Sequence, residues 1–263
     1  MRQNGPIMRI IATLALLVSF ASAEITVKRI WSTLDGKVYE SLLVRDPAIT
    51  AKRPGVLIVH QWMGITDHEI GVAKKLAAMG YVAFVADIYG KGVRPKNAGE
   101  AGKEAGKYRA GNGALFRKHL QHAFDTMKTR KEIDTGKLAA IGYCFGGGGV
   151  LEMARMGLDL KGVVSFHGGL KTALPAEKGA IKAKILVCHG ADDPFVPVDQ
   201  VLGFMKEMRA AAANWQLNTY CDAVHAFTQK SAKMKGKAEY NEQAAKRSWA
   251  AMVAFLKECL AGA

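Results

Sequence analysis

The chain has 263 residues, of which 49% are hydrophobic and 23% charged, and its formal net charge is +14. This balance excludes a disordered or collagen-like chain and allows a sizeable core. Four cysteines are too few for a disulfide scaffold. The positive charge favours an anionic partner or serves solubility alone.

The N-terminus has the pattern of a secretory signal peptide. Arg2 and Arg9 give it a positive start, and the eleven residues Ile10–Phe20 are predominantly apolar. Ala21-Ser22-Ala23 then matches a small-x-small cleavage site. The apolar run is too short to cross a bilayer, which takes about 20 residues. A cleaved signal is therefore favoured over the alternative, an uncleaved membrane anchor.

Cleavage at this site would divide the chain into a signal peptide, residues 1–23, and one domain, residues 24–263. Since no twin arginine precedes the apolar run, we expect export by the general route. The mature protein is then periplasmic or secreted, with no membrane span. Met8 is an alternative start, because the residues after it still form a short signal.

Short apolar runs alternate with amphipathic stretches along the rest of the chain. Gly55–His60 is typical of a strand buried on both faces, and Asp67–Met79 has a helical period. The pair Asp35-Gly36 predicts a hairpin turn. The alternation predicts one α/β domain, with a mostly parallel sheet and helices on both faces. The expected strands are 25–31, 38–44, 55–60, 81–86, 138–141, 162–166, 185–189 and 216–221, and the expected helices are 67–79, 98–130 with a break near 111–113, 145–156, 198–212 and 241–260.

A nucleophile elbow follows the expected strand 138–141. The segment Gly142-Tyr143-Cys144-Phe145-Gly146 has the G-x-S-x-G pattern with sulfur in place of oxygen. Glycines two residues before and after Cys144 avoid clashes in the sharp turn. The amides of the following helix favour a thiolate and can bind an oxyanion. A buried, inert cysteine in a glycine-rich turn is the alternative, but the position between strand and helix favours a nucleophile.

A nucleophile of this kind needs a base and a group that orients the base. In this fold the chain order is nucleophile, acid, histidine. Asp193 follows the expected strand 185–189 and is preferred as the acid, with Asp192 as the alternative. His225 follows the last expected strand and is the candidate base. Six other histidines compete: His60, His167 and His189 follow or close strands, and His68, His119 and His122 lie in helical segments.

With these residues the chain resembles the dienelactone hydrolase family of α/β-hydrolases. The cysteine elbow is the most specific feature. The resemblance implies that Cys144, Asp193 and His225 form a catalytic triad and that the amides of Phe145 and Trp62 form the oxyanion hole. The resemblance rests on the segments Val59–Gly64, Ala86–Gly90, Ile141–Gly147, Asp193–Pro197 and His225–Phe227.

The resemblance also implies a substrate pocket that includes Gln61, Tyr89, Lys91 and Phe227. Two of the family's features are changed here. Members commonly carry a glutamate where this chain has Gln61, so a thiol-priming role of that glutamate does not transfer unchanged. The two arginines that hold the substrate carboxylate would fall near Lys91 and Gln229. Lys91 keeps the positive charge but not the paired N–H donors of arginine, and Gln229 keeps neither.

These features predict a hydrolase that cleaves a carboxylic ester or lactone through an acyl-thioester. A peptidase or thioesterase on the same fold is the first alternative. A non-catalytic binding protein is the second alternative. Its best support is Gln61, which stands where family members commonly carry a glutamate. We expect a monomer that binds a small ester or lactone, with an anionic substrate as one option, and needs neither metal nor cofactor. We expect no nucleic-acid partner.

Two further patterns leave alternatives open. Residues 91–131 contain eleven Lys and Arg against three acids, which favours solvated helix faces over a collar for anionic substrates or an anionic surface. Cys188 and Cys221 close strands that we expect to be neighbours, so they could form a disulfide or remain buried free thiols. Cys259 is expected in the core.

Overall fold

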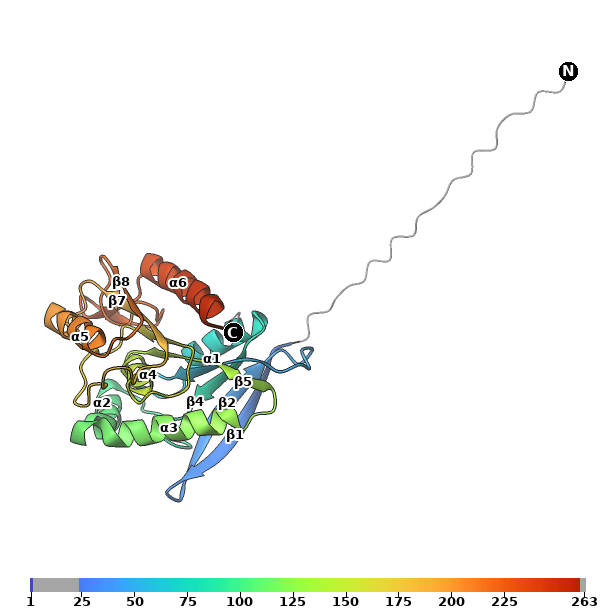
Figure 1. Cartoon of the computed structure of the whole chain (residues 1–263), viewed down its shortest axis with the longest axis horizontal. Helices are drawn as coiled ribbons and strands as arrows, with labels where there is room; N and C mark the ends of the chain where they lie inside the picture. The colour runs from blue at the N-terminus through green and yellow to red at the C-terminus, as the bar shows by residue number, and fades with distance from the viewer. Residues whose placement is uncertain (2–23, 261–263) are drawn as a thin grey trace.

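Eight strands form one central sheet in the computed structural model of the chain, which describes Met1 and residues 24–260 (Figure 1). In order across the sheet they are β1 (Thr26–Leu34), β2 (Lys37–Arg45), β4 (Val82–Ala86), β3 (Arg53–Val59), β5 (Ile133–Tyr143), β6 (Gly162–Phe166), β7 (Lys184–Gly190) and β8 (Trp215–Tyr220). Strand β2 is antiparallel to both of its neighbours, and every other neighbouring pair is parallel. The expected mostly parallel sheet is therefore confirmed.

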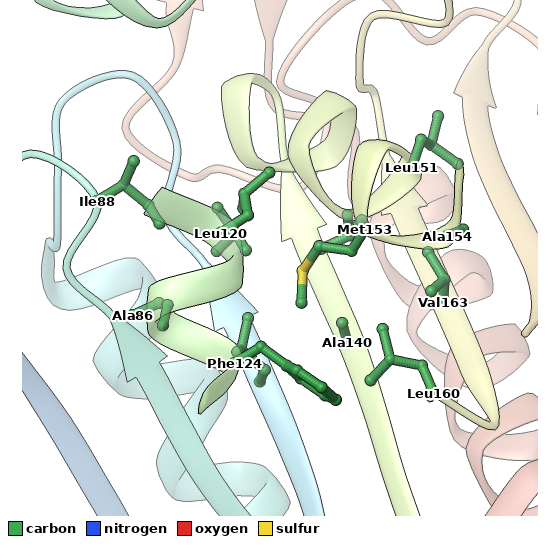
Figure 2. Packing of buried hydrophobic residues seen from close by; sticks show 14 of the residues in the cluster. Ala86, Ile88, Leu120, Phe124, Ala140, Leu151, Met153, Ala154, Leu160 and Val163 are labelled. Atoms are coloured by element: carbon green, nitrogen blue, oxygen red, sulfur yellow. The ribbon is translucent and has the colours of Figure 1, made fainter. Parts of the chain in front are cut away.

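Helices cover both faces of this sheet, as the sequence predicts (Figure 1). They are α1 (Asp67–Ala78), α2 (Ala98–Arg109), α3 (Ala114–Lys128), α4 (Phe145–Arg155), α5 (Val198–Ala210) and α6 (Glu242–Leu260). One core layer lies under α1 and α6, and the other under α3, α4 and α5. Figure 2 shows the second layer, where Leu120 and Phe124 of α3 and Met153 of α4 lie over Ala140 of β5.

The structure also tests smaller features of the sequence analysis. The hairpin turn is confirmed, because Asp35 and Gly36 both have positive φ, +49° and +73°. The break between α2 and α3 is a single 3₁₀ turn, η1 (Gly111–Gly113). A short hairpin of β9 (Lys233–Met234) and β10 (Ala238–Glu239) was not expected. Apart from Met1, the predicted signal peptide lies outside the described residues.

Within residues 24–260, none of the helices is both long and apolar enough to cross a membrane.

The turn from β5 to α4 holds Cys144 in a strained backbone conformation. Its φ of +53° and ψ of −110° are a backbone conformation that residues other than glycine rarely adopt. The backbone packs so closely here that a Cβ on Gly142 would overlap the carbonyl oxygen of Gly146. A Cβ on Gly146 would meet the carbonyl oxygens of Val59 and His60. Close backbone packing therefore requires both glycines of the elbow.

Gly146→Ala should destabilise the protein by about 3 kcal/mol or more, because the added methyl group meets backbone atoms that cannot rotate away. Gly71→Ala is the matched control, since a Cβ at this position in α1 has nothing within 4 Å. That variant should gain up to about 1 kcal/mol from the better helix propensity of alanine. Urea unfolding measures both, and equal stabilities would contradict the packing argument.

Candidate active site

Three side chains that the sequence singles out meet beyond the carboxyl ends of three strands. Cys144 follows β5, Asp193 follows β7 and His225 follows β8. His225 Nδ1 lies 2.8 Å from Asp193 Oδ2, and the imidazole is near enough to the thiol of Cys144 for each group to shift the pKa of the other. The carboxyl edge of a parallel sheet is where such folds place ligands. The structure thus brings thiol, imidazole and carboxylate together, with the carboxylate hydrogen-bonded to the imidazole.

The carboxylate in this chain is Asp193 and not its neighbour Asp192. The side chain of Asp193 is fully buried, and its second oxygen, Oδ1, accepts the backbone N–H of Phe195 at 2.9 Å. Both carboxylate oxygens are therefore fixed, one by the backbone and one by the imidazole. Asp192 is exposed, and its backbone N–H donates to Ala223 O.

The contact between His225 and Cys144 shifts both groups toward their charged forms. Burial disfavours a charged imidazole, but hydrogen bonds to Asp193 and Cys144 outweigh it and raise the pKa of His225 to about 10. Burial also opposes a thiolate, but His225 and, less strongly, the positive charge of Arg109 lower the pKa of Cys144 below its ordinary value. Both shifts favour an imidazolium paired with a thiolate, and the thiolate is the reactive form of cysteine.

The unexpected hairpin β9–β10 holds the backbone of His225. The N–H of His225 donates to Lys237 O at 3.2 Å, and the N–H of Glu239 donates to His225 O at 3.0 Å. His225 also bridges to Ala238 of β10. Strands of two residues leave no periodic pattern in a sequence. The turn glycine Gly236, with φ +66°, is the one local signal that could have indicated the hairpin.

Two backbone amides predicted to bind an oxyanion lie beside the thiol. Phe145 and Trp62 line the same cavity as Cys144, and the N–H of Phe145 interacts with the sulfur. In the part of the chain that the structure describes, the N–H of Trp62 has no hydrogen-bond acceptor. The side-chain oxygen of Gln61 accepts the N–H of Met63 at 2.9 Å, which fixes the loop around Trp62.

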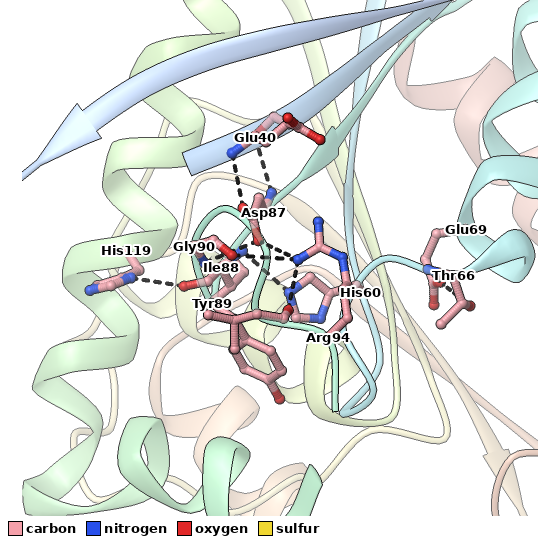
Figure 3. Close-up of polar contacts among 12 residues, drawn as sticks. Glu40, His60, Thr66, Glu69, Asp87, Ile88, Tyr89, Gly90, Arg94 and His119 are labelled. Atoms are coloured by element: carbon pink, nitrogen blue, oxygen red, sulfur yellow. Dashed lines mark hydrogen bonds and ion pairs between the residues drawn. The ribbon is translucent and has the colours of Figure 1, made fainter. Parts of the chain in front are cut away.

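Buried polar groups support this loop from behind (Figure 3). The Glu69 carboxylate accepts the backbone N–H of Thr66 at 2.9 Å and that of Gln61 at 3.3 Å, so it joins the two ends of the loop. Burial raises the pKa of Glu69. His60 Nε2 accepts the N–H of Ile88 at 3.2 Å, and burial lowers the pKa of His60 to about 4. These contacts hold the loop rigid at the edge of the cavity.

A cavity of about 1200 Å³ opens in front of Cys144. Its apolar wall includes aromatic rings from three segments, Trp62, Phe116 and Phe195. Gln61 also lines it, as the sequence predicts. A volume of this size fits a small-molecule substrate.

The other three predicted pocket residues lie outside the cavity lining. Tyr89 is buried behind the loop and donates its hydroxyl to Trp62 O at 3.0 Å. Lys91 is exposed, with its ammonium 6.0 Å from the ring centroid of Trp31. Phe227 is fully buried. Each follows a family motif in sequence, but the direction of a side chain after a strand end depends on loop geometry that the sequence does not reveal.

Four cationic side chains and one carboxylate line the cavity. The cations are Arg94, Arg109, Lys171 and Lys233, and the carboxylate is Glu152. Glu152 is already paired with arginines of α3 and α4. Among the described residues Arg109, Lys171 and Lys233 form no ion pair. The cavity is therefore positively charged.

The sequence analysis missed two of these cations, although both belong to the basic stretch 91–131 that it noted. It assigned that stretch mainly to solvated helix faces, whereas Arg94 and Arg109 line the cavity. Asp87 holds Arg94 with an Oδ1–Nη1 distance of 3.4 Å (Figure 3). Gln229, near which the family's second arginine would fall, does line the cavity, and its buried Nε2 has no hydrogen-bond partner among the described residues.

All four cysteines are free thiols. Cys188 is buried and Cys221 exposed, so the disulfide that the sequence left open is not formed. Burial raises the pKa of Cys188 to about 12, which makes it an unreactive thiol. Among residues 24–260, the side chains of His, Cys, Asp and Glu form no group of three or more that could hold a metal ion.

The chain is similar to known proteins in sequence. A sequence model described as "Dienelactone hydrolase family" matches residues 40–260. A Salmonella typhimurium protein that carries the provisional name carboxymethylenebutenolidase is 25% identical over 223 residues, which are 81% of this chain and 80% of that protein. An uncharacterized protein of Caenorhabditis elegans is 34% identical over 157 residues, 57% of this chain and 97% of that one.

Two solved structures are similar in both fold and sequence. The structure titled "m3DLH" has a TM-score of 0.85 and 34% identity, and the match covers 90% of this chain and 100% of that one. A dienelactone hydrolase-like promiscuous phosphotriesterase, P91, from metagenomic libraries has a TM-score of 0.84 and 34% identity, with 90% and 99% coverage.

Proposed function

Because the chain belongs to the dienelactone hydrolase family, we propose that it cleaves a carboxylic ester or lactone with Cys144 as the nucleophile. The observation that carries the proposal is the meeting of Asp193, His225 and Cys144 at an open cavity, with Asp193 hydrogen-bonded to the ring and His225 lowering the pKa of the thiol. A binding protein without catalysis would have no need of a thiol whose pKa is lowered in this way. The α/β-hydrolase fold presents nucleophiles in this way.

The proposed mechanism starts from the thiolate and imidazolium. The thiolate of Cys144 attacks the ester carbonyl carbon, and the carbonyl oxygen becomes an oxyanion held by the amides of Phe145 and Trp62. His225 then gives its Nε2 proton to the leaving alkoxide, the C–O bond breaks, and an acyl-thioester remains. Water attacks this thioester as His225 takes its proton. The C–S bond then breaks, which releases the acid and restores the thiolate of Cys144.

Each donor in the proposed oxyanion hole contributes on the order of 3–4 kcal/mol to stabilisation of the transition state. Asp193 holds the imidazole so that its Nε2 faces the sulfur, and it stabilises the imidazolium. All these groups come from one chain, so the proposed chemistry requires no second copy.

We propose further that the substrate carries a negative charge. The unpaired cations Arg109, Lys171 and Lys233 at the cavity support this, because opposite charges attract a substrate and orient it. Neither of the family's two arginine positions carries an arginine here, so the dienelactone substrate itself does not follow. The sequence pattern of residues 1–23 supports the proposal that the enzyme acts after export, in the periplasm or outside the cell.

The acyl-thioester is the intermediate that distinguishes this proposal. Wild-type protein mixed with a p-nitrophenyl ester and quenched in acid should carry one acyl group, mapped by peptide mass spectrometry to Cys144 and removed by hydroxylamine. An acyl group on another side chain would refute the assignment. Lactones, thioesters, peptide anilides and a phosphotriester in the same assay separate the alternative activities, and the phosphotriester is included because the similar P91 is described as a phosphotriesterase.

A further inference from the structure

His167 lies directly behind the thiol and has no role in the proposed mechanism. It follows β6, which lies between β5 and β7 in the sheet. Its side chain is fully buried, and its ring centroid is 5.2 Å from that of His225. The backbone N–H of Cys144 is shared between Phe166 O at 3.0 Å and His167 Nδ1 at 3.2 Å, and His167 Nε2 lies 2.8 Å from Thr228 Oγ1. His167 therefore touches both the elbow and the loop that carries the base.

The two hydrogen bonds fix the protonation of this ring. Since Nδ1 accepts a backbone N–H, it carries no proton, and the single proton of a neutral imidazole sits on Nε2 and is donated to Thr228. Burial, then the positive charge of His225, then His68, lower the pKa of His167 well below its ordinary value. The ring is thus neutral at neutral pH, so Nδ1 remains available as the acceptor for Cys144.

The two segments that His167 joins are otherwise held by different neighbours, Cys144 by Phe166 O and the backbone of His225 by the hairpin β9–β10. Cys144 sits in a strained turn after β5, and His225 sits in an irregular segment after β8, three strands further along the sheet. Asp222 and Ala226, on either side of His225, both have positive φ, +55° and +56°. A small shift of this segment would separate the imidazole from the thiol. A rigid link between the two segments would prevent that shift.

We propose that His167 is a positioning residue that ties the Cys144 elbow to the His225–Thr228 loop and thereby sets the contact between thiol and imidazole. The inference rests on the proposed role of these two groups. It adds the chain Cys144 N–H to His167 to Thr228 as a second support, parallel to the bond between Asp193 and His225. The sequence analysis noted His167 only as a competitor for the role of base.

Thr228→Val and Thr228→Ser test this link. Valine has the shape of threonine but lacks the hydroxyl that accepts the Nε2 proton, whereas serine keeps it. The readout is the pH dependence of Cys144 alkylation by iodoacetamide, followed by peptide mass spectrometry so that Cys221 is not counted. We expect Thr228→Val to move the alkylation midpoint to higher pH. It should slow alkylation at pH 7 by about tenfold, the effect of losing one buried hydrogen bond.

Thr228→Ser should keep the wild-type midpoint. Thr126→Val on α3, which loses a hydroxyl bonded to His122 O, is the remote control. Urea unfolding reports whether each variant is folded. A wild-type profile for Thr228→Val would overturn the proposal, and so would equal shifts for the valine and serine variants, because the methyl group and not the hydroxyl would then matter.

His167→Asn gives a second test that does not depend on Thr228→Val folding. Asparagine can place an acceptor where Nδ1 lies but cannot reach Thr228, so its midpoint should also rise. Adding Thr228→Val to His167→Asn should cost nothing more, since the bond is already lost. Additive effects would contradict the link. Alkylation needs no substrate. A failure to find any ester substrate would therefore count against the proposed function, whereas the role of His167 would still be decided by the alkylation profiles.

Discussion

Replacement of Cys144 by alanine is expected to lower kcat for ester hydrolysis by a factor on the order of 10⁶, because no other group can form the acyl intermediate. The fold should be unchanged. Alanine meets the same positive φ at this position as cysteine, and the side chain is only partly buried. Steady-state kinetics with a p-nitrophenyl ester measures the loss, and urea unfolding confirms that the variant is folded.

Cys221→Ala is the matched control, since it removes an exposed thiol that lies outside the cavity lining. Its activity should equal that of the wild type. Retained hydrolysis in Cys144→Ala would mean that another side chain or a water molecule is the nucleophile. Equal losses in both variants would mean that activity depends on thiol content in general and not on the elbow.

The parts of the site that the sequence predicted depend on short-range steric rules. The spacing of Gly142, Cys144 and Gly146 follows from a turn in which the backbone passes close to Val59, and any chain that makes this turn needs the same pattern. The order of nucleophile, acid and base along the chain indicated Asp193, although Asp192 remained an alternative. The burial of Asp193 and its hydrogen bonds to the ring and to Phe195 N–H distinguish the two in the structure.

The parts that the sequence analysis missed depend on how segments far apart in the chain lie together. Arg94 and Arg109 belong to a stretch whose charges resemble those of any solvated helix, and only folding places these two at the cavity. Lys91 fell at a family position but points to the outer surface beside Trp31. The role proposed for His167 rests on contacts with the turn after β5 and with the loop after β8 at once, which no local pattern encodes.

Asp193→Asn is expected to lower kcat by a factor on the order of 10⁴, as the equivalent change does in other enzymes with such a triad. The Phe195 N–H needs an acceptor, so the amide oxygen of asparagine would take the place of Oδ1. The amide NH₂ group would then face His225 Nδ1 and force that nitrogen to accept. The ring proton would move to Nε2, the nitrogen that must take the proton of Cys144.

The same substitution should also raise the pH at which Cys144 is half alkylated. The bond to Asp193 raises the pKa of His225, so its loss lowers that pKa, and a neutral imidazole no longer stabilises the thiolate. Asp192→Asn makes the identical change in an exposed neighbour and should leave both kcat and the alkylation profile close to those of the wild type. If both variants lost activity equally, the negative charge near the site, and not the orientation of the ring, would carry the effect. A loss confined to Asp193→Asn, together with the raised alkylation midpoint, would assign the effect to the proton on the imidazole.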